Sequence, residues 1–177
     1  VQEKRICLFY FIFCFRFSIL KFFFFYFLFF YFLFYFISRI QFVSTRQEGG
    51  AAYMAEAYGK LTGKPGVLMV TRGPGASNAA IGLHTAYQDS TPMVVLIGQV
   101  GTDMAEREAF QEIDYRRMFA QSAKWVGSID RADRVDEYIS HAFHLAQSGR
   151  PGPVVLALPE DVLFAKAEGK PVEVAHL

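Results

Sequence analysis

The sequence has only two cysteines and almost no net charge. Both cysteines, Cys7 and Cys14, lie close to the N-terminus, so a disulfide framework and a multi-cysteine metal site are excluded. A cysteine-free remainder suits a reducing compartment. The formal net charge is +1 and the basic residues form no stripe beyond Arg39, so nothing in the composition points to nucleic acid as a partner. At 177 residues the chain is long enough for one domain with its own core.

Aromatic residues are concentrated at the N-terminus, where 15 of the 20 phenylalanines occur in the first 40 positions. Phe22 to Ile37 is an unbroken apolar run, shorter than the roughly 20 residues of a membrane span. No small-residue cleavage site precedes Arg39, which argues against a signal peptide. Three interpretations stay open: a membrane segment, a buried core element, or sequence that is not native coding sequence. We therefore expect a Phe/Tyr-rich low-complexity or membrane-like segment over 1–39, and a separate domain over 40–177.

From residue 40 onward, strand-like and helix-like segments alternate. This rhythm predicts an α/β fold with an open, mostly parallel sheet and helices on both faces. The predicted strands cover 40–45, 67–71, 93–98, 124–126 and 154–158, and the predicted helices 48–61, 76–88, 113–119 and a last one from Asp130, as N-cap, to Gly149. The apolar face of the last helix consists of Val135, Tyr138, Ile139, Ala142, Phe143 and Ala146. Ligands of such sheets bind at the carboxyl ends of the strands.

Two turns at that edge combine polar side chains with glycine. Arg46–Ala52, RQEGGAA, places Glu48 at the start of a helix made of small residues. A helix N-terminus stabilises a carboxylate, so Glu48 taken alone also fits an ordinary first-turn role. Thr71–Asn78, TRGPGASN, contains glycines that let the backbone approach a ligand closely. It is not a dinucleotide fingerprint, because Asn78 stands where the third glycine would be.

Six segments, in this order and spacing, resemble the N-terminal pyrimidine-binding domain of thiamine-diphosphate enzymes of the acetolactate synthase type. They are RQEGGAA at 46–52, TRGPGASN at 71–78, YQDSTP at 87–92, GQV at 98–100, AFQE at 109–112 and SGRPGPV at 148–154. The set is highly specific for the family. It is less specific for the reaction, because carboligases and decarboxylases of the superfamily share much of the pattern.

The resemblance implies roles for individual residues. Glu48 matches the glutamate that hydrogen-bonds the cofactor's pyrimidine and so promotes loss of the thiazolium C2 proton. The implied cofactor-binding residues are Gly73, Pro74, Gly75, Asn78 and Gln99, with Arg150 as an FAD contact in flavin-containing members. Gln99, Phe110, Gln111 and Lys124 match positions near the substrate entrance. Simpler roles compete with three of these: a surface lysine for Lys124, a core residue for Phe110 and a helix C-terminal cation for Arg150. His84, His141 and His144 are interpreted as structural.

The sequence also departs from the family pattern. Gln47 stands where many members have histidine directly before the glutamate. The Phe-rich stretch replaces the first strand and helix of the family, and no Gly-Asp-Gly motif occurs. We therefore expect a truncated domain that is inactive alone, with Mg²⁺ supplied only by an absent diphosphate domain.

The parent enzyme implied by the resemblance is a transferase of branched-chain amino acid biosynthesis. It would act on 2-keto acids such as pyruvate, in the cytoplasm or an organelle. A homo-oligomer or a partner subunit would complete its site. The alternatives are a non-catalytic partner, a membrane-tethered module, or a fragment of another thiamine-diphosphate decarboxylase.

Overall fold

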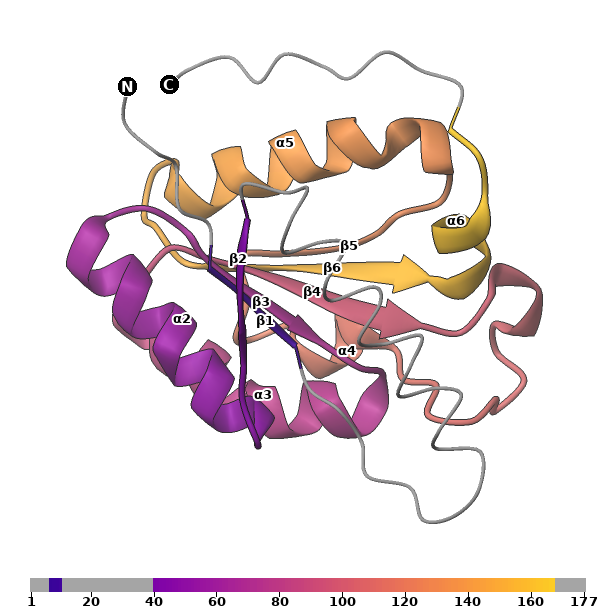
Figure 1. Cartoon of the computed structure of the whole chain (residues 1–177), viewed down its shortest axis with the longest axis horizontal. Coiled ribbons are helices and arrows are strands. Elements are labelled where there is room, and N and C mark those ends of the chain that lie inside the picture. Colours follow the sequence, from indigo (N-terminus) through magenta and orange to yellow (C-terminus); the bar gives the residue numbers. More distant parts are fainter. Residues whose placement is uncertain (1–6, 11–39, 168–177) are drawn as a thin grey trace.

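The centre of the fold is a four-stranded, all-parallel sheet (Figure 1). The structure is a computed structural model and describes residues 7–10 and 40–167. The strands lie in the order β3-β4-β6-β5, with the bounds Gly66–Val70 for β3, Met93–Gln99 for β4, Trp125–Ser128 for β5 and Pro153–Pro159 for β6. A separate parallel pair is formed by β1 (Cys7–Tyr10) and β2 (Gln41–Ser44). The sequence-based prediction of a mostly parallel α/β sheet is confirmed.

Helices cover both faces of the sheet (Figure 1). On one face α2 (Glu48–Thr62) and α3 (Gly73–Gln88) pack with the short α4 (Tyr115–Met118) around a core that includes Leu68 and Ile97. On the other face α5 (Val135–Gln147) and α6 (Glu160–Phe164) bury a second core. All six residues expected on the apolar face of α5 belong to this second core. Burial on both faces explains why β3, β4 and β6 are almost continuously apolar.

Small residues let α2 and α3 approach each other closely. Ala52 and Gly82 meet at their contact, where a Cβ on Gly82 would lie 2.5 Å from the Ala52 Cβ. α3 begins directly after β3, so its N-terminus lies at the carboxyl edge of the four-stranded sheet. Close packing of the two helices brings Glu48, in the first turn of α2, to Asn78, in the second turn of α3.

The helix boundaries differ from the predictions in two places. The Gly73-Pro74-Gly75 turn is the first turn of α3 rather than a loop before it, because proline fits the first helical positions. Asp130 is not the N-cap of α5, and this prediction is wrong. A 3₁₀ turn, Ala132–Arg134, precedes the helix, and the Asp130 carboxylate instead accepts a hydrogen bond from Arg134 Nη1 at 2.7 Å.

The interpretations of the Phe-rich segment fall on residues 1–6 and 11–39, outside the described residues. Among the described residues, no helix has both the length and the apolar character needed to cross a membrane.

Candidate functional site at the carboxyl edge of the sheet

Glu48 is a buried carboxylate at the first position of α2. Its side chain is only 3% exposed, and its Oε2 accepts a hydrogen bond from Asn78 Nδ2 at 3.1 Å. Gln47 is the N-cap of α2, and its side-chain oxygen accepts a hydrogen bond from the Gly50 amide at 2.9 Å. The Gly50 amide therefore does not need Glu48 as its acceptor. A carboxylate buried at this depth needs partners, and here Asn78 and the positive end of α2 provide them.

Glycines keep the backbone close to this carboxylate. A Cβ on Gly75 would lie 2.8 Å from Thr71 Cγ2 and 3.6 Å from Glu48 Oε1, so a larger residue would fill the space beside the carboxylate. A Cβ on Gly49 would lie 3.2 Å from the Asn78 carbonyl oxygen. The first turns of α2 and α3 thus form a narrow cradle around Glu48. Pro74, between the two glycines, belongs to the same first turn of α3.

Gln99 and Gln111 lie at the same edge of the sheet and tie the loop after β4 to the cradle. Gln99 Nε2 donates to the Ile113 carbonyl oxygen at 2.8 Å, and its Oε1 accepts from the Val100 amide at 3.0 Å. The Gln111 carbonyl oxygen accepts from the Gly73 amide at 3.1 Å. Phe110, beside Gln111, is 78% exposed, so it is not a core residue in this chain.

Lys124 lies at the opposite, amino edge of the sheet, directly before β5. Its ammonium donates to the carbonyl oxygens of Leu145, in a short contact, and of Ser148, at 2.7 Å. Burial lowers the pKa of Lys124. Within this chain the structure does not bring Lys124 together with Glu48, because residues that precede parallel strands lie at the edge away from the ligand-binding ends.

Arg150 also lies at the amino edge, directly before β6. Its Nε donates to Ser90 Oγ and its Nη2 to the Tyr87 carbonyl oxygen, each at 2.8 Å. The guanidinium also lies 5.4 Å from the centre of the Tyr87 ring. The side chain therefore holds the turn before β4, and the FAD contact implied for it remains a prediction.

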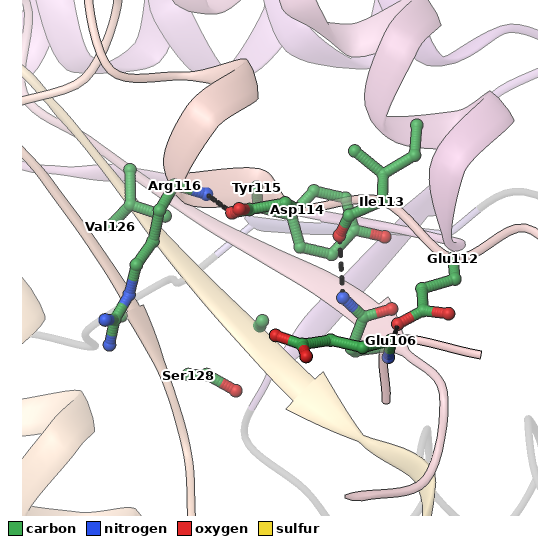
Figure 2. A pocket seen from close by; sticks show the side chains of 11 residues that line it. Glu106, Glu112, Ile113, Asp114, Tyr115, Arg116, Val126 and Ser128 are labelled. Carbon is green, nitrogen blue, oxygen red and sulfur yellow. Dashed lines mark hydrogen bonds between the residues drawn. The ribbon is translucent and has the colours of Figure 1, made fainter. Parts of the chain in front are cut away.

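A cavity of about 290 Å³ opens at the carboxyl edge between the loop after β4, α4 and β5 (Figure 2). Figure 2 shows Glu106 and Glu112 together on one side of it and Val126 and Ser128 on the other. Glu48 does not line this cavity. Among the described residues, no group of three or more His, Cys, Asp and Glu side chains could hold a metal ion.

Three side chains at this edge were not singled out from the sequence. Tyr115 donates its hydroxyl to the Gly98 carbonyl oxygen at 2.9 Å. Burial raises the pKa of Tyr115 to about 12, and the positive charge of Arg72 opposes this shift. Arg72, beside the Gly-Pro-Gly turn, forms an ion pair with Glu160 at the start of α6. Only the position of Arg72 next to the turn could have drawn attention to it, because Tyr115 and Glu160 lie in no recognisable motif.

The sequence matches known proteins over most of the described fold. It is 43% identical to the acetolactate synthase isozyme 3 large subunit of Escherichia coli K12 over 127 residues, which are 72% of this chain and 22% of that protein. It is 42% identical over 127 residues to the mitochondrial acetolactate synthase catalytic subunit of Saccharomyces cerevisiae, of which it covers 18%. A probable acetolactate synthase large subunit of Methanococcus aeolicus is 46% identical over 118 residues. The chain spans about a fifth of the length of these curated relatives.

Residues 30–118, half of the chain, match the family described as thiamine pyrophosphate enzyme, N-terminal TPP binding domain. The match contains the cradle around Glu48 and the loop that carries Gln111. The resemblance predicted from the six sequence segments is confirmed: the chain belongs to the thiamine pyrophosphate enzyme family and carries an N-terminal TPP-binding domain of the acetolactate synthase type.

Proposed function

We propose that Glu48 binds and orients the aminopyrimidine of thiamine diphosphate, as part of an acetolactate synthase-like carboligase that acts on 2-keto acids such as pyruvate. The observation that carries this proposal is the buried Glu48 carboxylate, which Asn78 holds through Oε2 and which the Gly75 backbone approaches so closely that a Cβ there would lie 3.6 Å from Oε1. A carboxylate and an amide next to a glycine-lined surface suit a flat, nitrogen-containing ring that donates and accepts hydrogen bonds.

Each residue of the candidate site has a separate role in this proposal. Glu48 hydrogen-bonds the ring nitrogen that carries a proton and holds that proton in place. Asn78 fixes the carboxylate, and Gly75 would let the backbone lie against the ring. Thiamine diphosphate, when bound, supplies the electron sink for decarboxylation and carbon–carbon bond formation. Burial of Glu48 keeps water away from the proton that it holds.

We propose that other groups complete the catalytic site. The sequence contains no Gly-Asp-Gly segment, and the diphosphate and Mg²⁺ would be held by another domain or by a second subunit of a homo-oligomer. The carboligase reading is favoured over another decarboxylase because the matching relatives named above are acetolactate synthases. The location proposed for the parent enzyme is the cytoplasm or an organelle, and the mitochondrial relative of Saccharomyces cerevisiae supports the organelle. The 177 residues alone should show no carboligase activity.

Binding measurements on the full chain test the proposal. Titration calorimetry with thiamine diphosphate should show weak binding that the substitution Glu48→Gln weakens by about tenfold to a hundredfold, as for loss of a charged hydrogen bond. Glu137→Gln is the matched control, because Glu137 pairs with Arg134 on the exposed side of α5. Equal affinity of the two variants would contradict the assignment of Glu48. Turnover of pyruvate by the chain with Mg²⁺ and thiamine diphosphate would contradict the proposed inactivity.

A further inference from the structure

The loop between β4 and α4, here called the 105–113 loop, has an unusual backbone. Three of its residues that are not glycine have positive φ angles within six positions: Glu106 at 63°, Glu108 at 53° and Gln111 at 67°. Left-handed backbone is unfavourable for residues with a Cβ and persists only where surrounding contacts impose it. Some interaction must therefore hold this loop in shape.

The Glu112 carboxylate provides that interaction. Its Oε1 accepts from the Glu106 amide at 2.6 Å (Figure 2). Its Oε2 accepts from the Ala109 amide at 3.0 Å. The Glu112 amide closes the same ring by donating to the Ala109 carbonyl oxygen at 2.9 Å. Hydrogen bonds from amides to an ionised carboxylate are stronger than those between neutral groups. One side chain thus holds the amides on either side of the left-handed Glu108.

The far end of the loop lies against the cradle of Glu48. The Gly73 amide belongs to the first turn of α3, whose N–H groups have no partner within the helix, and the Gln111 carbonyl oxygen supplies one at 3.1 Å. The contact is tight, since a Cβ on Gly73 would lie 2.9 Å from that oxygen and 3.0 Å from Ile113 Cδ1. A change in the loop therefore reaches the turn that contains Gly75.

We propose that Glu112 is a positioning residue that orients the Gly73–Gly75 turn beside Glu48 through the 105–113 loop. The carboxylate keeps Gln111 in its left-handed conformation, and Gln111 holds the Gly73 amide. Phe110 lies between two fixed neighbours, because the Ala109 amide is bound by Glu112 and the Gln111 carbonyl by Gly73. The backbone of Phe110 is thereby held in place, while its side chain is exposed. The role in cofactor binding rests on the proposed function, whereas the coupling between Glu112 and Gly73 does not.

Amide hydrogen exchange, followed by NMR on the full chain without cofactor, tests the coupling directly. In Glu112→Ala, exchange at the Gly73 amide should be about tenfold faster than in the wild type, while amides in the centre of β4 stay protected. Glu112→Gln retains one carbonyl acceptor and should give an intermediate rate. Glu108→Ala is the matched control, because this exposed glutamate has the same left-handed backbone in the same loop. It should leave Gly73 unchanged.

Unchanged Gly73 exchange in a folded Glu112→Ala variant would overturn the proposal. If the β4 amides also lose protection in that variant, Glu112→Gln decides: an intermediate Gly73 rate supports the coupling, and a wild-type rate refutes it. Thiamine diphosphate titrations then separate the two proposals. One outcome is that Glu112→Ala speeds exchange at Gly73 while neither the wild type nor any variant binds thiamine diphosphate. That outcome would refute the proposed function and leave the positioning role intact.

Discussion

Asn78 and Glu48 are separated by 30 positions in the chain, yet the Asn78 amide donates to the Glu48 carboxylate at 3.1 Å. The contact joins the first turn of α2 to the second turn of α3. It is also the contact that fixes the direction of a buried carboxylate. The helix pair, the hydrogen bond and the glycine beside it together make the candidate site.

Replacing the Asn78 side chain should lower the free energy of unfolding, and an acidic replacement should lower it more than alanine. Asn78→Ala should lower the free energy of unfolding by about 1–3 kcal/mol, because the buried carboxylate loses its donor. Asn78→Asp should cost more, since two carboxylates would then share the buried site. Urea unfolding measures both, with Ser140→Asp on the exposed side of α5 as the control for added charge. Equal stability of Asn78→Asp and the wild type would contradict the contact.

Two glycines in α2 and α3 should respond to alanine with opposite signs. Gly82→Ala should destabilise the fold by about 1–3 kcal/mol, because its Cβ would lie 2.5 Å from the Ala52 Cβ. Gly50→Ala should stabilise it by about 0.5–1 kcal/mol, since nothing lies within 4 Å of its Cβ and alanine favours a helix. Thermal and urea unfolding of the two variants give the signs. A stabilising Gly82→Ala would show that the helices lie farther apart.

Tyr115 should make the fold sensitive to alkaline pH. Its pKa is about 12 in the folded chain, mainly through burial, against 10.0 for a free tyrosine. Below pH 10 both states keep the proton and the stabilisation is complete. Between pH 10 and 12 the unfolded chain loses its proton first, so stability falls by about 2 kcal/mol. Tyr115→Phe should lose less stability than the wild type between about pH 9 and pH 11.

Arg150 should act on the turn before β4 and not on the cradle. Arg150→Lys loses the fork of hydrogen bonds to Ser90 and the Tyr87 carbonyl, so the free energy of unfolding should fall by about 1–2 kcal/mol. Arg117→Lys, whose side chain is 91% exposed, should change it by less than about 0.5 kcal/mol. Thiamine diphosphate affinity should be equal in both variants. A loss of affinity in Arg150→Lys alone would place this arginine in the binding machinery after all.

The sequence predicted the sheet and helices well because their signals are local. Each of three signals lies within one segment: the near-continuous apolar strands, the apolar face of α5, and the glycine at position 63 that ends α2 in a left-handed conformation. The predicted start of α5 was wrong because aspartate is a residue type that often caps helices, and the sequence predicts Asp130 as the N-cap. Its carboxylate instead pairs with Arg134, the last residue of the 3₁₀ turn that precedes α5. The five residues of α6 are too few to show a helical period.

The candidate site could be predicted only where it coincided with a motif. Glu48, Gly75 and Asn78 were named together, and the structure brings them together. Lys124 was expected near the substrate entrance with Phe110 and Gln111, but it lies directly before β5 at the amino edge of the sheet, where its ammonium donates to the carbonyl oxygens of Leu145 and Ser148. The Glu112 carboxylate was missed because its partners are backbone amides, which leave no mark in the sequence.

The most direct test of Glu48 uses the two halves of the cofactor separately. NMR spectra of the chain should shift at the amides of Gly73, Gly75 and Asn78 when 4-amino-5-hydroxymethyl-2-methylpyrimidine is added. The thiazole fragment of thiamine should leave these amides unchanged, and Glu48→Gln should abolish the response to the pyrimidine. Equal responses to both fragments, or a response to the pyrimidine that survives in Glu48→Gln, would contradict the assignment of this carboxylate to the aminopyrimidine.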